Sequence, residues 1–261
     1  MASGIYASHE PYLEYCRHTN EKTKLHTLLR RRLPRIAAER ALDAGCGNGI
    51  NTAAIAHMLP QTQVTGVDES PAQLSHARTH NAAPNTNYEQ GRLESHEGKD
   101  YGFILLSHVL QYASTDTSAM VRNAITRLAP GGELWVIQQG REGLAQIITH
   151  QRPLLDNPVF ADWKTFEDYL PTIRREARSA GCLLKTIKIG SSIKQIDFDD
   201  PSAGDKLRLQ FILGLKKPFD EQTPEFKRHL ARLKLGNGRR ISHPNHVAVI
   251  TRPARRSPIL K

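Results

Sequence analysis

A glycine-rich turn in the first third of the chain lies between two carboxylates, Asp43 and Asp68. The turn Gly45-Cys46-Gly47-Asn48-Gly49 follows the apolar run 40–44, and Asp68 ends a second apolar run at 64–67. Glycines permit a tight turn whose backbone lies directly against a ligand. A carboxylate after the next strand can accept hydrogen bonds from both hydroxyls of a ribose. This pattern predicts an enzyme that binds a cofactor containing a nucleoside.

Asp43, two residues before Gly45, narrows the choice of cofactor. Glycine turns of this form serve nicotinamide, flavin and S-adenosylmethionine proteins alike. A carboxylate at this place would repel a pyrophosphate, whereas it suits a cofactor that carries an ammonium and a sulfonium. The turn therefore favours S-adenosylmethionine. Cys46 has no nearby base in the sequence, so we interpret it as a small residue of the turn.

Short apolar runs alternate with helical patterns from residue 41 to residue 138. We expect strands at 41–45, 63–67, 86–90, 102–107 and 133–138, and helices at 48–58, 71–80 and 116–128. Ser70-Pro71 is typical of a helix start, since serine caps and proline fits the first turn. The segment 129–132, Ala-Pro-Gly-Gly, is expected to end the preceding helix. The alternation implies an α/β fold with a mostly parallel sheet covered by helices on both faces.

The two ends of the chain depart from this alternation. One or two helices are expected within 10–33, a helix at 165–180, and strands at 182–189 and 246–251. The long segment between the last two strands carries helical patterns at 204–214 and 224–235 and is far longer than a hairpin connection. We therefore expect an N-terminal helical cover (1–37), a core (38–190 and 245–252), a substrate-capping insertion (191–244) over the ligand-bearing edge of the sheet, and a basic, disordered tail (253–261).

The composition limits the classes of protein to which this chain can belong. The 261 residues are 39% hydrophobic, enough for one full core. The chain contains no run of about 18 apolar residues, so we expect no membrane span. Its first residues do not resemble a secretory leader, so we expect none. Three cysteines, Cys16, Cys46 and Cys182, fit neither a disulfide framework nor a zinc site. We expect a cytoplasmic protein without a metal, as a monomer or homodimer.

The formal charge of +10 leaves two interpretations open. Basic residues cluster at Arg30–Arg32 with Arg35, at Arg239-Arg240, and in the tail from Arg252. Such a balance is compatible with a nucleic-acid partner or an acidic substrate, and equally with a solvated basic surface. The arginine runs lack interleaved aromatic residues, so they indicate nucleic acid only weakly.

Several segments together resemble the class I methyltransferases. They are the turn with Asp43 and Asp68, the segment Leu106-Ser107-His108-Val109-Leu110, and Pro130-Gly131-Gly132 before a strand. The resemblance covers residues 38–140. It implies a Rossmann-like, seven-strand sheet, S-adenosylmethionine as cofactor, and transfer of a methyl group.

Within that superfamily, most of the chain is similar to the histamine N-methyltransferase group of small-molecule enzymes. The matching segments are Tyr12-Leu13-Glu14 through Lys24, Leu33-Pro34, Asp68 to Gln73, Phe103 to Tyr112, and the insertion before the last strand. This resemblance and the turn give the cofactor-binding candidates Asp43, Gly45, Cys46, Gly47, Asp68, Glu69, Gln73, Glu94, Ser95 and Ser107. The resemblance implies acceptor contacts near Lys24, His108, Gln111, Tyr112 and the segment His243-Pro244-Asn245.

Two departures from that group bear on the acceptor. Lys24 stands where the histamine enzyme offers a carboxylate, with Glu14 and Glu21 nearby as alternatives, and His108 stands where it has a glutamine. A cationic amine would be repelled by Lys24. We therefore expect the methyl acceptor to be a small metabolite that is neutral or carries a carboxylate, such as an amino acid or organic acid, and not histamine. The methyl group goes to nitrogen or oxygen.

Each of the catalytic candidates His108, Tyr112 and Lys24 has an alternative role that is not catalytic. His108 follows a buried strand and is either a proton acceptor or substrate contact, or a structural histidine. Tyr112 walls the acceptor pocket or fills core, and Lys24 binds the acceptor or faces solvent. His243 and His246 line the site or occupy plain loop and edge positions, and Trp163 and Phe166 roof the acceptor or pack.

Two other functions stay open. The basic charge favours an enzyme that modifies RNA or protein, although the chain has no Asn-Pro-Pro-Tyr segment, no Pro-Cys segment and no recognised RNA-binding module. The departures at the acceptor residues are also compatible with a protein that binds the cofactor without catalysis.

Overall fold

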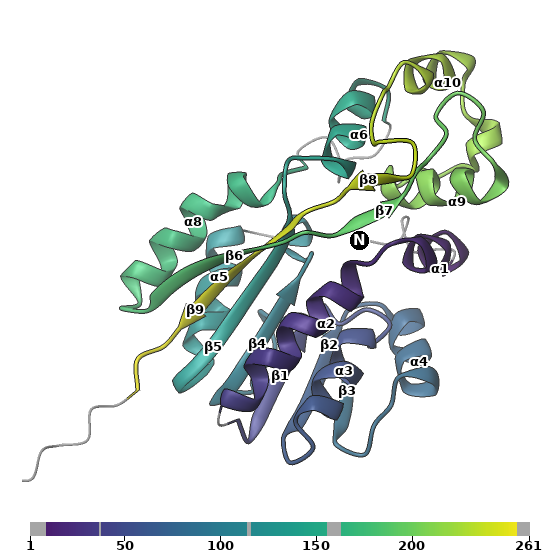
Figure 1. Cartoon of the computed structure of the whole chain (residues 1–261). Coiled ribbons are helices and arrows are strands. Elements are labelled where there is room, and N and C mark those ends of the chain that lie inside the picture. The colour runs from purple at the N-terminus through teal and green to yellow at the C-terminus, as the bar shows by residue number, and fades with distance from the viewer. Residues whose placement is uncertain (1–8, 37, 114–115, 156–162, 255–261) are drawn as a thin grey trace, which may run out of the picture. The chain divides into compact units, whose positions relative to one another are not determined.

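The computed structural model describes residues 9–36, 38–113, 116–155 and 163–254 (Figure 1). The chain forms two compact units. Unit 1 comprises Met1–Lys24, Gln139–Glu167 and Lys188–Asn245, and unit 2 comprises Leu25–Gln138, Asp168–Ile187 and His246–Lys261. The expected tail at 253–261 lies outside the described residues from position 255 on.

A sheet of seven strands in the order β3-β2-β1-β4-β5-β9-β6 forms the centre of unit 2. The strands are β1 (Arg40–Ala44), β2 (Gln63–Asp68), β3 (Thr86–Gln90), β4 (Tyr101–Ser107), β5 (Leu128–Gln139), β6 (Leu183–Ile189) and β9 (Asn245–Thr251). The pairs β1–β2, β1–β4, β2–β3 and β4–β5 are parallel. The predicted α/β class with a seven-strand, mostly parallel sheet is confirmed.

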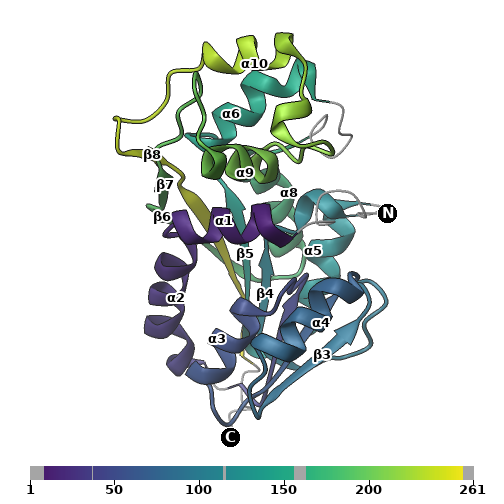
Figure 2. The same ribbon diagram turned by 90° about the vertical axis from the view of Figure 1, so that its right-hand side faces the viewer.

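The helices of unit 2 cover both faces of this sheet. They are α2 (Glu21–Arg32, in unit 2 from Leu25 on), α3 (Ile50–Met58), α4 (Pro71–His80), α5 (Thr117–Thr126) and α8 (Phe166–Ser179, in unit 2 from Asp168 on). Figures 1 and 2 show α2 and α3 on one face and α5 and α8 on the other. Short 3-10 turns follow at Leu33–Arg35 and Leu110–Tyr112.

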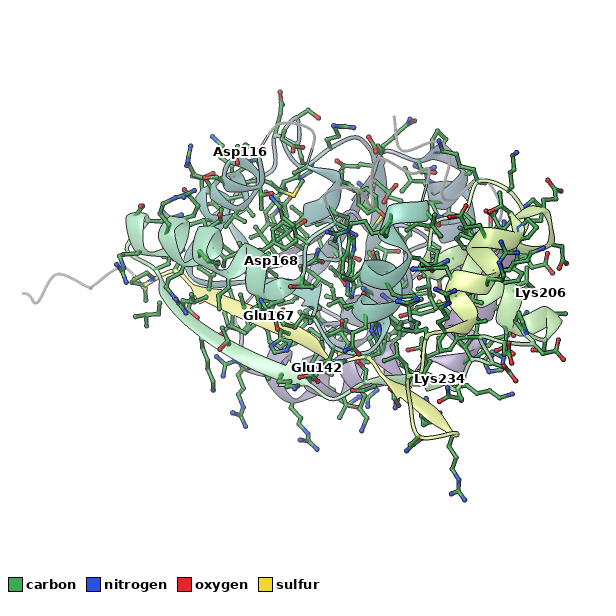
Figure 3. All side chains as sticks on the ribbon, turned by 90° about the horizontal axis from the view of Figure 1, so that it is seen from above. Asp116, Glu142, Glu167, Asp168, Lys206 and Lys234 are labelled. Atoms are coloured by element: carbon green, nitrogen blue, oxygen red, sulfur yellow. The ribbon has the colours of Figure 1, made fainter. Side chains whose placement is uncertain are left out.

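The elements of unit 2 form for local reasons that the residues explain. Strand β4 is buried from Tyr101 to Leu106, as a central parallel strand requires. Ser70 caps α4 by accepting a hydrogen bond from the amide of Gln73, and Pro71 occupies the first turn, as predicted. Asp116, labelled in Figure 3, caps α5 through the amide of Ser118 at 2.9 Å.

The start of β5 differs from the expectation. The segment 129–132 was expected to be a turn before a strand at 133, but β5 runs from Leu128 through these residues. The register against β4 shifts between Tyr101 and Phe103, so the extra residues form a bulge. Gly131 donates to the carbonyl of Arg252, and the amide of Arg252 donates to the carbonyl of Gly132. Pairing with the residue after β9 therefore keeps the Pro-Gly-Gly segment extended.

Unit 1 is mainly helical, with a small antiparallel ladder. Its elements are α1 (His9–His18), the first turn of α2, α6 (Leu144–Gln151), α9 (Ala203–Ile212), α10 (Pro224–Ala231), β7 (Ser192–Lys194) and β8 (Arg240–Ser242). The helices predicted in 10–33, 204–214 and 224–235 are present, and α6, β7 and β8 are additional. None of the described helices combines the length and hydropathy of a membrane span.

Apolar residues from all three segments of unit 1 build its core. Tyr15 from α1, Ile147 from α6, Ile193 from β7 and Leu209 from α9 belong to one buried cluster. The turn after α1 is joined to β7, because the amide of Asn20 donates to the carbonyl of Ser192 at 3.1 Å. The N-terminal helix is thereby an integral part of unit 1.

The buried carboxylate of Glu176 joins α8 to α5 in unit 2. It accepts hydrogen bonds from Ser118 at 2.6 Å, Arg122 at 3.0 Å and Arg175 at 3.0 Å. These donors, Ser118 first, lower the pKa of Glu176 from 4.5 to about 2 despite its burial. The carboxylate therefore stabilises the folded state fully above about pH 4.5, and this contribution is lost as the pH falls toward 2.

We expect Glu176→Gln to lower the free energy of unfolding by about 1–2 kcal/mol at pH 7, since charge-assisted hydrogen bonds become neutral ones. Denaturant unfolding followed by tryptophan fluorescence measures this. The difference from wild type should shrink below pH 4.5. The exposed Glu97→Gln variant is the matched control, and an equal loss of stability in both variants would contradict the assignment.

Candidate functional site

The glycine turn lies at the carboxyl end of β1 in unit 2. The amides of Gly45 and Cys46 both donate to the carbonyl of Val67, at 2.7 and 3.0 Å, which ties the turn to the end of β2. Gly45 and Gly47 have positive φ angles of 75° and 53°. A Cβ on Gly45 would lie 2.2 Å from Val109, whereas a Cβ on Gly47 would meet nothing closer than 4.0 Å. The backbone at Gly47 therefore borders open space, as a ligand cradle requires.

Asp68 is held next to this turn. Its carboxylate accepts hydrogen bonds from the amide of Gly47 at 2.8 Å and from the amide of Ser70 at 2.9 Å. Burial raises the pKa of Asp68, and the two amides act in the opposite direction. The two bonds use one lone pair on each oxygen, so both oxygens keep acceptor capacity. The predicted ribose acceptor is thus fixed in orientation beside the glycine turn.

Asp43 and Cys46 lie beneath the turn. Asp43 is buried on β1 and accepts a hydrogen bond from the hydroxyl of Thr52 at 2.7 Å, which links the strand to α3. Burial, with Asp43 and Asp68 nearby, raises the pKa of the Cys46 thiol. The thiol stays protonated at neutral pH, which agrees with a packing role for Cys46 rather than a nucleophilic one.

Three buried polar atoms around the turn have no hydrogen-bond partner in the described part of the chain. They are Nδ2 of Asn48 in the turn, Oε1 of Gln73 on α4, and Oγ of Ser107 at the end of β4. Buried polar atoms are paired in more than nine cases of ten, so such a group indicates a binding site. Gln73 and Ser107 were predicted cofactor residues. Asn48 was missed, although its place inside the turn was a usable signal.

The remaining cofactor candidates lie along the ends of β2 and β3. Glu69 forms an ion pair with Arg92 at 2.5 Å. Ser95 is exposed and donates to the carbonyl of Arg92 at 3.2 Å, and Glu94 is half-buried. A cavity of about 370 Å³ adjoins this segment and is lined by residues that include Val67, Gln90, Gly91, Arg92, Ser95 and His96. Of the predicted cofactor residues, Ser95 lines this cavity.

His108 directly follows β4 and has a left-handed backbone with φ of 57°. Its amide donates to the carbonyl of Ile137 at 2.9 Å, and its carbonyl accepts from Nε2 of Gln111 at 2.7 Å. Gln138 in turn donates to Gln111 at 2.6 Å. Such conformations cost energy outside glycine and concentrate at functional sites. The network of Gln111 and Gln138 maintains this conformation.

Tyr112 lies in the 3-10 turn that follows His108. It is half-buried, and it interacts with the neighbouring Tyr169 of α8. Burial, then Asp168 and Tyr112, raise the pKa of Tyr169 to about 12. Tyr112 is thus neither fully packed in the core nor fully exposed.

The acceptor candidates of unit 1 divide by burial. Lys24 is exposed on α2, and Glu14 pairs with Arg17 and His18. Glu21 is buried, and so is His243, which lies in the loop between β8 and β9.

Trp163 and Phe166 are buried, and Trp163 belongs to the apolar core of unit 1. Trp163 is thus a packing residue. His246, in unit 2, is half-buried at the start of β9.

The Methyltransferase domain family matches residues 41–132. Trans-aconitate 2-methyltransferase of Methylobacterium nodulans is 32% identical over 124 residues, 47% of this chain and 47% of that protein. The chain spans about half the length of several such relatives. The enzyme of the same name from Delftia acidovorans is 26% identical over 227 residues, 81% of this chain and 82% of that protein.

A solved structure extends the similarity to nearly the whole fold. The plantazolicin methyltransferase BpumL, crystallised with a desmethylPZN analog and SAH, has a TM-score of 0.60 and 12% identity, with 97% of this chain and 94% of that chain covered. The sheet order, the glycine turn and the domain match define a class I, S-adenosylmethionine-dependent methyltransferase domain. The chain carries such a domain, as the sequence predicted. The similarity to the histamine N-methyltransferase group stays a prediction.

We expect Asp68→Ala to weaken the binding of S-adenosylhomocysteine by about 1–3 kcal/mol, because charge-assisted hydrogen bonds to the ribose are lost. Isothermal titration calorimetry measures the change. The exposed Asp199→Ala variant is the control. Unchanged affinity in Asp68→Ala would mean that the nucleoside lies elsewhere.

Proposed function

We propose that the chain is an enzyme that transfers the methyl group of S-adenosylmethionine to a carboxylate oxygen of a small organic acid. The observation that carries this proposal is the similarity to a trans-aconitate 2-methyltransferase over 81% of the chain. The net charge of +10 favours an anionic acceptor as well.

The residues around the turn suit the proposed cofactor. Asp68 would accept the ribose hydroxyls, the backbone at Gly47 would lie against the ligand, and Gln73 and Ser107 would use their unpartnered atoms. Asp43 supplies negative charge beneath the site. We also propose Gly45, Cys46 and Glu69 as neighbours of the cofactor, and Glu94 and Ser95 as its outer contacts.

The cofactor supplies an electrophilic methyl group with a neutral thioether as leaving group. A carboxylate is already ionised at neutral pH, so the protein needs no base to activate it. Its task is to align the acceptor oxygen with the methyl group and to exclude water. We propose that His108, whose left-handed backbone is held by Gln111, orients the acceptor, and that Tyr112 borders it.

Lys24 is exposed on α2 of unit 1. We propose that it attracts the anionic acceptor by its charge.

Isotope-labelled S-adenosylmethionine and a panel of organic acids, amino acids, amines and total RNA test the proposal. We expect labelled product from one or more di- or tricarboxylic acids, detected by mass spectrometry. Labelled RNA in place of labelled acid would support the alternative that the basic charge favours. Binding of the cofactor without any labelled product would support the catalytically inactive alternative.

The pH dependence separates a carboxylate from an amine acceptor. We expect kcat/KM with the acid to change by less than about threefold between pH 6 and pH 8, because a carboxyl group with a pKa near 4 is ionised throughout. An amine with a pKa near 10 would give a rate that rises about tenfold per pH unit. Initial rates in a buffer of constant ionic strength decide between them.

A further inference from the structure

The antiparallel ladder of unit 1 places two cations directly opposite each other. Lys194 of β7 and Arg240 of β8 are register partners, and so are their buried neighbours Ile193 and Ile241, which face the other side (Figure 1). Opposite residues in such a ladder have Cα atoms about 5 Å apart. Like charges in this arrangement destabilise a strand pair. The ladder therefore carries a pair of cations that does not serve its own stability.

Further cations lie next to this pair. Arg239 is joined to β7, because the amide of Gln195 donates to its carbonyl at 2.9 Å. The carbonyl of Leu235, the residue after Lys234, accepts a hydrogen bond from Nε2 of the same Gln195 at 2.7 Å. The cationic surface, as we define it, consists of the exposed residues Lys194, Arg232, Lys234, Arg239 and Arg240.

The sequence around this surface supplies positive charge without negative charge. Residues 226–245 include six lysines and arginines and no aspartate or glutamate. Phe226 and Leu230 are buried in the core of unit 1, and Leu233 and Leu235 pack against it. The apolar residues thus attach the segment to the core, and the cations among them face solvent.

The charge of the surface is largely uncompensated. In the part of the chain that the structure describes, none of Lys194, Arg239 and Arg240 forms an ion pair. Lys234 is close enough to the exposed Asp197 to lower the pKa of that carboxyl, after two backbone amides. An external anion would therefore be attracted to the ladder and its turn rather than to a surface that is already neutral.

The arginines of the surface are held in position. Oδ1 of Asn237 accepts hydrogen bonds from the amides of Arg239 at 3.1 Å and Arg240 at 2.9 Å, which orders the turn before β8. Nε and Nη2 of Arg240 donate to the hydroxyl and the carbonyl of Ser192, at 2.7 and 2.9 Å. The guanidinium has further N–H groups for an anion. A side chain that is already ordered loses little entropy when it binds.

The chemistry of the surface favours one class of anionic partner. Segments that lie on an anionic membrane combine cations with exposed apolar side chains, and protein interfaces have an apolar or aromatic centre. Within the described residues of unit 1, no large apolar side chain is exposed, and the exposed Leu183 belongs to unit 2. A phosphate backbone needs cations alone.

We infer that the cationic surface docks a nucleic acid through its phosphate backbone. The planar guanidinium groups of Arg239 and Arg240 match phosphate oxygens, and Lys194 adds a point charge beside them. The inference goes beyond the proposed function, because docking requires no methyl transfer to the nucleic acid and is compatible with a small acid as methyl acceptor.

Binding of RNA at several salt concentrations tests the surface. The full chain is titrated into a fluorescent single strand of about 20 nucleotides at about 50 to 200 mM salt, and anisotropy gives the affinity. Each cation that meets a phosphate steepens the fall of log K with log salt by about 0.7. We expect the double variant Lys194→Gln/Arg239→Gln to reduce this slope by about 1.4 and to weaken binding at least fivefold at the lowest salt. Arg240 is kept, because its side chain also joins the two strands.

Lys216→Gln/Lys217→Gln is the matched control, since it removes two exposed charges of unit 1 outside the cationic surface. It should leave the slope and the affinity close to those of wild type. Equal losses in the two double variants would show attraction by net charge alone and would overturn the docking surface. Binding of the full chain to phosphatidylserine vesicles but not to RNA would overturn it as well.

Thermal unfolding separates docking from structural support. The melting temperature of Lys194→Gln/Arg239→Gln should equal or exceed that of wild type, because the contact of like charges opposite Arg240 is relieved. Its affinity for S-adenosylhomocysteine should be unchanged. A lower melting temperature together with wild-type RNA binding would assign these cations to structure and contradict the inference. The assay measures binding without turnover, so its result is independent of whether the proposed methyl transfer occurs.

Discussion

The hydrogen bond from the amide of Gly47 to the carboxylate of Asp68, 2.8 Å long, is the constraint on which the donor half of the site depends. It joins the end of β1 to the end of β2 at the place where the carbonyl of Val67 holds Gly45 and Cys46. A side chain at Gly45 would collide with Val109, so the turn exists only with glycine there. The parallel pairing of β1 with β2 and β4 brings the turn, Asp68 and Ser107 to one edge of the sheet.

Two histidines, one in each unit, are held by hydrogen bonds from other elements. In unit 1, the ring of His243 is held by a buried carboxylate and a tyrosine from two other elements. In unit 2, the strained backbone of His108 is maintained by the amides of Gln111 and Gln138. In unit 1 the neighbours orient the side chain of His243, and in unit 2 they hold the backbone of His108.

Much of the fold could be predicted from local signals in the sequence. Alternating apolar runs and helical patterns located β1 to β5 and α3 to α5, and Ser70-Pro71 located the start of α4, because caps and strand burial are properties of neighbouring residues. The bulge of β5 was missed, since the pairing that keeps Pro130 to Gly132 extended comes from Arg252. The β7–β8 ladder depends in the same way on pairing between distant segments.

Functional residues could be predicted from the sequence only where their own segment carries a motif. The glycine turn and Asp68 were predictable because the turn and the strand that follows carry their own motif. The cluster of Tyr15, Glu21 and His243 was not, because nothing in any one segment marks residues that meet only after folding. Lys24, chosen from a resemblance, is exposed, whereas Glu21 on the same helix is buried.

Transfer to a carboxylate oxygen is the central claim, and the chemical stability of the product tests it most directly. The labelled product of the wild-type enzyme would be treated with dilute hydroxide, and volatile labelled methanol would be measured. A methyl ester releases its label as methanol under this treatment, and that is the result expected here. A label that stays on the product would show a methylated nitrogen or an ether, and would contradict the account.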